Sequence, residues 1–263
     1  ALDHHARGGA HHRFGRDTEN VPALFGDFGH VQPRVHLRKQ HQRDRIFGVD
    51  RYGVLGEQIG GLITRLHRAE GIDVRCGVGV AEVSGDDRVR TVTLSDGSEL
   101  DADLVIVGIG SKPATDWLED SGITIDNGVV CDEVGRTTAP HVWAIGDVAS
   151  WLDVVAGQVR VEHWSNVADQ ARAMVPAMLG HEASAAVTVP YFWSDQYDVK
   201  IQCLGEPEAT DTVHIVEDDG RKFLAYYERD GVVVGVVGGG MPGKVMKTRA
   251  KIAAGAPIGD VLG

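Results

Sequence analysis

Apolar residues recur at helical spacing over residues 56–70. They fall on one helical face, and Gly71 follows them as a C-terminal stop signal. That face consists of Leu55, Ile59, Leu62, Ile63 and Leu66. The spacing predicts an amphipathic helix. Short segments after it predict strands over residues 72–76, 78–83 and 89–94. Asp96-Gly97, which follow the last of these, predict a hairpin turn.

Two later segments are apolar without alternation and end in glycine. Residues 104–107 are followed by Gly108-Ile109-Gly110, and residues 140–145 are followed by Gly146-Asp147. Continuous apolar runs of this length are typical of parallel strands that are buried on both faces. We therefore expect an α/β fold in which both segments are central strands.

The pattern changes again towards the C-terminus. A second helix is expected over about residues 164–179, with Pro176 shortening its last turn. From Thr188 onward, short strands are separated by hairpin turns at 218–220 and 230–231, and a helix around 244–254 closes the pattern. This region is expected to form an α+β C-terminal domain.

Composition and charge exclude several classes of protein. The 263 residues carry 26 Lys and Arg against 38 Asp and Glu, a net charge of −12, which argues against nucleic acid as the main partner. No apolar run reaches the roughly 18 residues of a membrane-spanning helix, so no membrane partner is expected. Three Cys residues lie far apart with no C-x-x-C spacing, which indicates a reducing, cytoplasmic setting.

The leading segment differs from the rest. Seven of the 12 His residues lie between His4 and His41, and residues 1–51 carry a net positive charge while the remainder is acidic. The adjacent pairs His4-His5 and His11-His12 lack the i,i+4 spacing of a helical zinc site, so no metal site is assigned. We expect residues 1–50 to be a disordered leader without an apolar strand.

One glycine motif fits a cofactor loop only superficially. Residues 238–243 satisfy G-x-G-x-x-G after a predicted strand over 232–237. Only 20 residues follow Gly243, too few for the returning strand and ribose-binding acid of a dinucleotide unit. We interpret the motif as a strand-to-helix turn.

A second group of residues points to chemistry. An Asp147 carboxylate at the end of a parallel strand can accept hydrogen bonds from sugar or polyol hydroxyls. Glu162-His163-Trp164 precede the second helix, whose positive N-terminus would stabilise charge on an electron-accepting ring. The alternatives are a plain Gly-Asp turn and ordinary packing at a helix start.

Three blocks carry a resemblance to a known family. They are residues 137–149 (TTAPHVWAIGDVA), 161–166 (VEHWSN) and 190–198 (PYFWSDQYD). Their order and spacing resemble the FAD-dependent NAD(P)H:ferredoxin reductases that serve oxygenases such as the aromatic-ring dioxygenases. These belong to the pyridine nucleotide-disulphide oxidoreductase superfamily. The likeness runs from about Val54 to the C-terminus.

The resemblance implies contacts with FAD and NAD(P)H. Gly146 and Asp147 look like the FAD ribityl site, and Glu162, His163 and Trp164 look like the segment at the flavin pyrimidine edge. Trp193 looks like the aromatic residue beside the isoalloxazine that faces the iron–sulfur partner. Gly108 and Gly110 resemble the strand end that approaches NAD(P)H. No side chain is expected to act as a catalytic nucleophile or acid.

The resemblance also implies a division of the chain, into an incomplete flavoprotein with two dinucleotide-binding domains. Members of the family carry two G-x-G-x-x-G loops, and neither stands at the expected place here. We expect a non-matching leader, a remnant of the NAD(P)H-binding domain, the C-terminal part of the FAD-binding domain and the reductase C-terminal domain, over residues 1–50, 51–112, 113–183 and 184–263.

Three functions follow as hypotheses. The first is a flavoprotein oxidoreductase that passes electrons from NAD(P)H through FAD to a ferredoxin-type [2Fe–2S] protein, impaired by the missing loops. The second is a non-catalytic docking or dimerisation module without flavin. The third is a flavoprotein like apoptosis-inducing factor or those associated with nitrite reductase, against which residues 190–198 favour the oxygenase-linked reductases. The choice between NADH and NADPH stays open, as does the oligomeric state.

Overall fold

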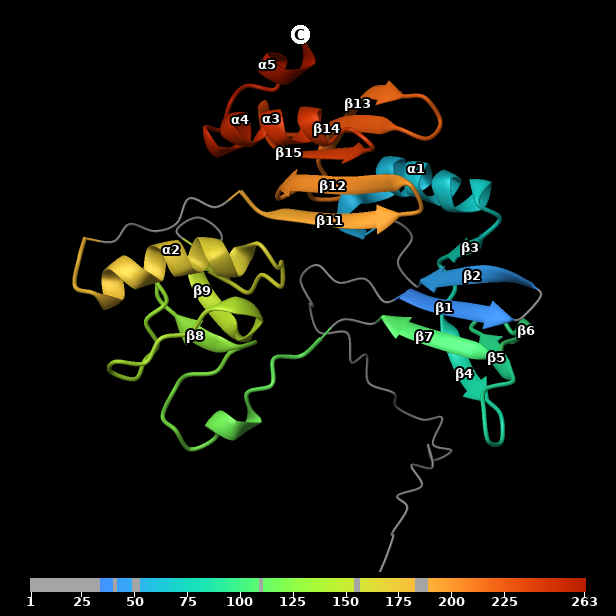
Figure 1. Cartoon of the computed structure of the whole chain (residues 1–263), viewed down its shortest axis with the longest axis horizontal. Helices are drawn as coiled ribbons and strands as arrows, with labels where there is room; N and C mark the ends of the chain where they lie inside the picture. Colours follow the sequence, from blue (N-terminus) through green and yellow to red (C-terminus); the bar gives the residue numbers. More distant parts are fainter. Residues whose placement is uncertain (1–33, 40–41, 49–52, 109–110, 154–156, 183–188) are drawn as a thin grey trace, which may run out of the picture.

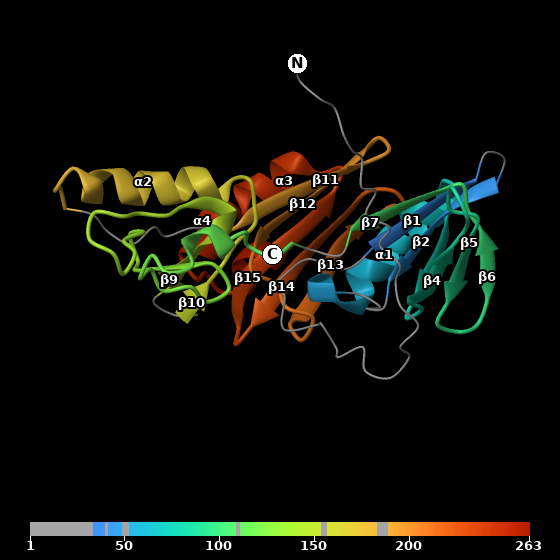
Figure 2. The same cartoon turned by 90° about the horizontal axis from the view of Figure 1, so that it is seen from below.

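The structure is a computed structural model that describes residues 34–39, 42–48, 53–108, 111–153, 157–182 and 189–263, with the backbone alone for 34–48. Figure 1 shows three groups of elements in these ranges. The group that contains α2 and the sheets near the N-terminus lie on opposite sides of the C-terminal sheet, and Figure 2 shows the same order after a quarter turn.

The C-terminal sheet has five antiparallel strands in the order β11-β12-β15-β14-β13. The strands are β11 (Tyr191–Gln196), β12 (Val199–Gly205), β13 (Thr212–Asp218), β14 (Phe223–Arg229) and β15 (Val232–Gly239). The two predicted hairpin turns are confirmed. Asp230 and Gly231 both adopt positive φ, which suits the tight connection between β14 and β15.

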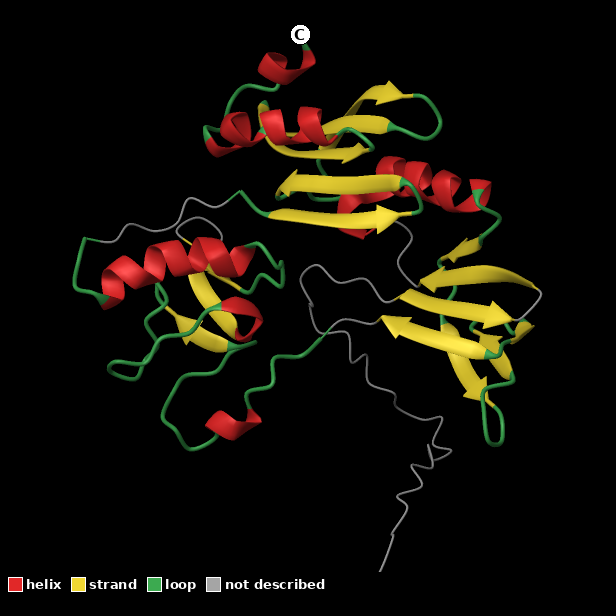
Figure 3. Ribbon diagram, viewed as in Figure 1, coloured by secondary structure: helices red, strands yellow, loops and turns green. Residues whose placement is uncertain are grey.

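Three short helices cover one face of this sheet, as Figure 3 shows. They are α3 (Pro242–Lys247), α4 (Arg249–Ala253) and α5 (Gly259–Leu262), and Val245 of α3 is fully buried against Leu204 and Val236. The single helix expected around 244–254 is therefore divided. It breaks at Thr248, whose hydroxyl donates a hydrogen bond of 3.2 Å to the Lys244 carbonyl oxygen.

Helix α1 (Gly56–Ala69) covers the opposite face of the C-terminal sheet and confirms the amphipathic helix predicted over 56–70. Its buried residues Ile59, Leu62 and Leu66 share one core with the sheet strands. The Tyr227 hydroxyl also donates a hydrogen bond of 2.8 Å to the Leu55 carbonyl oxygen. A helix early in the chain thus completes the hydrophobic core of the last domain.

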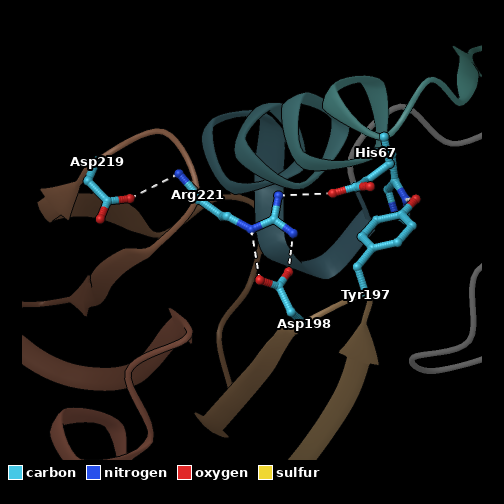
Figure 4. Close-up of polar contacts among 6 residues, drawn as sticks. His67, Tyr197, Asp198, Asp219 and Arg221 are labelled. Carbon is cyan, nitrogen blue, oxygen red and sulfur yellow. Dashed lines mark hydrogen bonds and ion pairs between the residues drawn. The ribbon is translucent and has the colours of Figure 1, made fainter.

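Polar contacts surround the packing of α1 on the sheet (Figure 4). The Arg221 guanidinium donates hydrogen bonds to the carboxylates of Asp198 and Glu70, the latter at 2.9 Å. His67 Nδ1 lies 2.8 Å from the Tyr197 hydroxyl, and Arg65 pairs with Asp218. The contacts of Arg65, His67 and Glu70 reach residues at least 130 positions away, so they fix the orientation of α1 as well as its burial.

Two further sheets are formed by strands from the first part of the chain. One has the order β3-β2-β1-β7, formed by Asp73–Cys76, Gln42–Gly48, Arg34–Lys39 and Leu104–Gly108. β2 and β3 are parallel and joined through α1, which makes a βαβ crossover. The other sheet contains β4 (Val80–Ser84), β5 (Thr91–Leu94) and β6 (Glu99–Asp101) around a small core that includes Val92 and Leu94. The strands predicted over 72–94 and the turn at 96–97 are confirmed.

Two expectations about these sheets are wrong. Residues 34–39 and 42–48 form β1 and β2, so the strand-free leader does not extend to residue 50. Residues 1–33, with their His pairs, lie outside the described residues. β7 is an outer strand paired antiparallel with β1, not a central parallel strand, and Leu104, Ile106 and Val107 are exposed. An apolar run alone cannot distinguish a central strand from an outer one.

The third group contains helix α2 (Asn166–Met178) over strands β8 (Val129–Cys131), β9 (Ala149–Asp153) and β10 (Gly157–Val159). The helix predicted over 164–179 is confirmed and ends two residues after Pro176. The strand predicted over 140–145 is wrong. Those residues form an extended loop, and the strand begins after Gly146-Asp147, with β9 parallel to β8. Among the helices of the described ranges, none has the length and apolar character that a membrane crossing requires.

Truncating the buried face of α1 should destabilise the C-terminal domain. Leu66→Ala removes a side chain that is 2% exposed and is expected to lower the free energy of unfolding by about 2–5 kcal/mol. Urea denaturation followed by circular dichroism measures this loss. Leu179→Ala, at a residue that is 67% exposed, is the matched control and should change it by less than about 0.5 kcal/mol. Equal effects would contradict the packing of α1 on the sheet.

Candidate functional site

The Gly146-Asp147 turn lies immediately before β9, in a short 3-10 segment over Gly146–Val148. Gly146 is buried with φ +78°, and its N–H donates a 2.7 Å hydrogen bond to the Gln170 side chain on α2. The Asp147 side chain is exposed, and no hydrogen bond or ion pair joins its carboxylate to another described residue. Its oxygens are therefore accessible to a ligand hydroxyl.

A buried ion pair lies behind this turn. The side chains of Arg160 and Glu162 are 6% and 16% exposed, and the guanidinium donates to the Glu162 carboxylate. Arg160 also donates to the Asp147 carbonyl oxygen at 3.0 Å and to Asn127 Oδ1 at 3.3 Å. The Ser111 hydroxyl donates to Glu162 at 2.5 Å. The pair thus joins segments that lie far apart in the sequence.

The Glu162 carboxyl titrates below its usual range. Burial raises its pKa, but the hydrogen bonds from Ser111 and Arg160, together with the Arg160 charge, lower that pKa by more. Glu162 is consequently a stable carboxylate that neutralises Arg160, and it is unsuited to proton transfer near neutral pH.

Aromatic side chains gather where the 162–166 segment meets strand β11. The rings of Trp164 and Trp193 lie 6.1 Å apart at 87°, and Trp193 stacks on Tyr191 at 5.5 Å. His163 contacts Phe192 at 5.3 Å between ring centroids, and the Ser165 hydroxyl donates to the Tyr191 carbonyl oxygen at 2.9 Å. Trp164 remains 83% exposed, so an extended aromatic surface is available to a planar ligand or a partner.

The structure brings most of the predicted residues together. Arg160 connects the Asp147 turn to Glu162, and Trp164 connects that segment to Trp193. Gly108 is the last residue of β7, and Ser111, three residues later, donates a hydrogen bond to Glu162. Gly110 lies outside the described residues.

Arg160, Ser111 and Gln170 were missed by the sequence argument. The alternation Arg160-Val161-Glu162 was the available signal for the first, because alternate residues of an extended chain point to the same side.

The glycine motif at 238–243 has a packing role. A Cβ on Gly238 would lie 2.6 Å from Val245, and one on Gly239 would lie 2.5 Å from the Phe223 ring. The space that a phosphate would need is thus filled by the chain's own side chains. This geometry supports the strand-to-helix turn interpretation, and the motif leads directly into α3.

The cysteines are placed for packing. Cys131 and Cys203 are buried and Cys76 is half-buried, and all three are free thiols. Burial raises the pKa of Cys131 to about 11 and raises that of Cys203 as well, so both stay protonated at neutral pH. Within the described ranges, no pair of Cys residues is arranged as a redox disulfide.

Two family models match this chain. Residues 41–171 match the family model described as pyridine nucleotide-disulphide oxidoreductase, and residues 191–261 match the model described as reductase C-terminal. A ferredoxin–NAD(P)(+) reductase from Sphingomonas sp is 38% identical over 186 residues, which are 69% of this chain and 45% of that protein. This chain belongs to the pyridine nucleotide-disulphide oxidoreductase family.

Other ferredoxin reductases extend the similarity. Rhodocoxin reductase from Rhodococcus erythropolis is 33% identical over 208 residues, covering 78% of this chain and 48% of that protein. The solved ferredoxin reductase for the CYP199A2 system from Rhodopseudomonas palustris has a TM-score of 0.73 at 31% identity, covering 78% of this chain and 51% of the other. The covalent putidaredoxin reductase–putidaredoxin complex also gives 0.73, at 28% identity over 81% of this chain and 54% of that one. The chain spans about half the length of these ferredoxin reductases.

The glycine motif offers a test with an internal control. Gly239→Ala is expected to lower the free energy of unfolding by about 1–3 kcal/mol, because the new methyl group overlaps the Phe223 ring. Gly243→Ala has open space and should leave stability unchanged or slightly raised. Thermal denaturation of both variants measures the two changes in stability. An unchanged stability in Gly239→Ala would refute the packing role.

The buried ion pair predicts a pH-dependent loss of stability. Glu162→Gln should lower the free energy of unfolding by about 1–2 kcal/mol at pH 7, since an amide cannot replace charge-assisted hydrogen bonds. Because the folded pKa of Glu162 lies below its unfolded value of about 4.3, this stabilisation is present above that pH and is lost as the pH falls through the folded pKa.

Urea unfolding at pH 7 and at about pH 3 measures this difference, which should shrink at the lower pH. Glu57→Gln, at an exposed position of α1, provides the control and should show little difference at either pH. If Glu162→Gln lowers the free energy of unfolding equally at both pH values, the charge of the carboxylate is not the stabilising feature.

Proposed function

We propose that this chain forms the flavin-contacting and partner-facing part of an NAD(P)H:ferredoxin oxidoreductase. Electrons would pass from NAD(P)H through FAD to a ferredoxin-type [2Fe–2S] protein. The observation that carries the proposal is the exposed Asp147 carboxylate, held beside the Glu162–Trp164 segment that leads into α2. The names of the similar proteins, which include ferredoxin and rhodocoxin reductases, support the same reaction class.

The described residues suit the ribityl and ring portions of FAD. Asp147 offers carboxylate oxygens without a partner in the described chain, which matches the hydroxyls of a ribityl group. Helix α2 contacts the same turn through Gln170. Its positive N-terminus, which the exposed Trp164 precedes, suits a planar, electron-accepting ring. Within the described ranges no open glycine loop is found for the pyrophosphate, because Gly238 and Gly239 are packed against side chains.

Bound FAD would supply the chemistry by accepting a hydride from NAD(P)H and releasing its electrons singly. Asp147 would orient the ribityl chain, and Glu162, His163 and Trp164 would fix the pyrimidine edge through their backbone. The helix dipole of α2 would favour negative charge at that edge. Trp164 and Trp193 would limit the access of water on the side that faces the iron–sulfur partner.

The nicotinamide side would be formed by the end of β7. We assign Gly108 and Gly110 to the approach of NAD(P)H, where the lack of side chains allows close contact with the backbone. Residues 51–112, together with strands β1 and β2 of the same sheet, would then be the remnant of the NAD(P)H-binding domain. Residues 113–183 would be the C-terminal part of the FAD-binding domain and 184–263 the reductase C-terminal domain. A cytoplasmic location fits this proposal, because the cytoplasm supplies NAD(P)H and keeps Cys thiols reduced.

A non-catalytic module is the second candidate. The apolar residues Val175, Met178 and Leu179 are exposed on α2 and at its end, which is typical of a surface that another protein covers. In this case the chain would serve as a docking or dimerisation module without flavin.

Flavin titration separates the two functions. After FAD is added and unbound FAD is removed by gel filtration, the purified chain should retain the visible absorption bands of a flavin. Asp147→Asn should weaken binding about tenfold through the loss of charge-assisted hydrogen bonds. Asp116→Asn, at another exposed aspartate of the same region, should bind FAD like the wild type. A protein that is colourless once unbound FAD has been removed would support the module and contradict the oxidoreductase.

A further inference from the structure

Arg160 is a buried cation at the meeting point of several chain segments. Its guanidinium donates to Asn127 Oδ1 at 3.3 Å, to the Asp147 carbonyl oxygen at 3.0 Å and to the Glu162 carboxylate. Ser111 adds a fourth segment through its hydrogen bond to Glu162. Only 6% of the Arg160 side chain is exposed, and its hydrogen bond to Glu162 is partly buried, where hydrogen bonds between charged groups are strong.

The neighbouring turn is shaped around the Arg160 side chain. Gly128 has φ +124°, and a Cβ there would lie 3.0 Å from Arg160 Cδ and 2.7 Å from the Val148 carbonyl oxygen. Asn127, just before it, adopts φ +46°, which presents its side-chain oxygen to the guanidinium. The Asn127-Gly128 turn thus forms a slot that only a glycine leaves open for the arginine stem.

Arg160 binds the backbone of Asp147 and leaves its carboxylate without a hydrogen bond from the guanidinium. Arg160 takes the backbone carbonyl oxygen of Asp147, while Glu162 supplies the balancing negative charge. The turn is therefore held in place without neutralising the Asp147 carboxylate. The forked guanidinium allows this, because it presents several donors in one plane towards separate acceptors.

We propose that Arg160 is a positioning residue of the flavin site. It holds the Asp147 turn and the Glu162–Trp164 segment in one fixed geometry, with the Asn127-Gly128 turn as its support. Ser111, three residues beyond Gly108, joins the proposed nicotinamide side to the same anchor. The inference rests on the proposed function for its role towards FAD, whereas its claim about the geometry of the turn is independent of any cofactor.

Hydrogen–deuterium exchange on the chain without added cofactor tests the geometric part. Arg160→Met should accelerate exchange about tenfold in peptides that cover residues 126–130 and 146–149. Arg160→Lys, which keeps the charge beside Glu162 but not the fork, should accelerate it almost as much. Arg172→Met, which removes an exposed ion pair with Asp169 on α2, is the matched control and should leave both regions unchanged. Unchanged exchange in Arg160→Met, or wild-type exchange in Arg160→Lys, would overturn the proposal.

A double variant separates positioning from charge balance. Arg160→Met leaves Glu162 as a buried, unpaired carboxylate, which Arg160→Met/Glu162→Gln removes. The double variant should regain thermal stability, yet its exchange should stay fast near residue 147 and its FAD dissociation constant should stay about tenfold above that of the wild type. Recovery of slow exchange and of FAD affinity would show that Arg160 only balances the charge of Glu162. If the wild type takes up no FAD, the proposed function fails, and the exchange experiment still decides the role of Arg160.

Discussion

The structure depends on the burial of one helical face. Ile59, Leu62 and Leu66 of α1 share a core with β12, β14 and β15, although 130 residues or more separate the helix from these strands. The C-terminal sheet is antiparallel and has an apolar surface on each side; α3 to α5 cover one side and α1 covers the other. Because α1 also connects β2 to β3, its docking places the sheets formed by the first part of the chain beside the last domain.

Local sequence patterns predicted the helices and hairpin turns, but they did not predict which elements pack against one another. The helix over 56–70 was found because its apolar residues share one face, and the C-terminal hairpins were found because Asp and Gly at 230–231 suit positive φ. The same periodicity says nothing about which sheet receives the helix. Its place in the C-terminal core follows from contacts such as Tyr227 to Leu55, which no local signal reveals.

The apolar residues before the Asp147 turn are packed without forming a strand. Apolar residues at 142–145 are accommodated by packing in a loop, where Ile145 adjoins the core around Trp151 and the Trp151 indole N–H donates to the Ala144 carbonyl oxygen at 2.9 Å. The Asp147 turn was found, but its support was not. Arg160 contributes through the direction of its guanidinium and through acceptors at Asn127 and Asp147, and a linear sequence does not specify such convergence.

The exposed outer strand β7 has a consequence for the handling of the protein. Leu104, Ile106 and Val107 present apolar side chains to solvent on a strand that ends the order of its sheet. Such a strand has backbone donors and acceptors along one edge that can pair with a second molecule. Concentrated solutions would then lose material through intermolecular sheet extension, and a lysine at residue 106 would interrupt that process without entering any described core cluster.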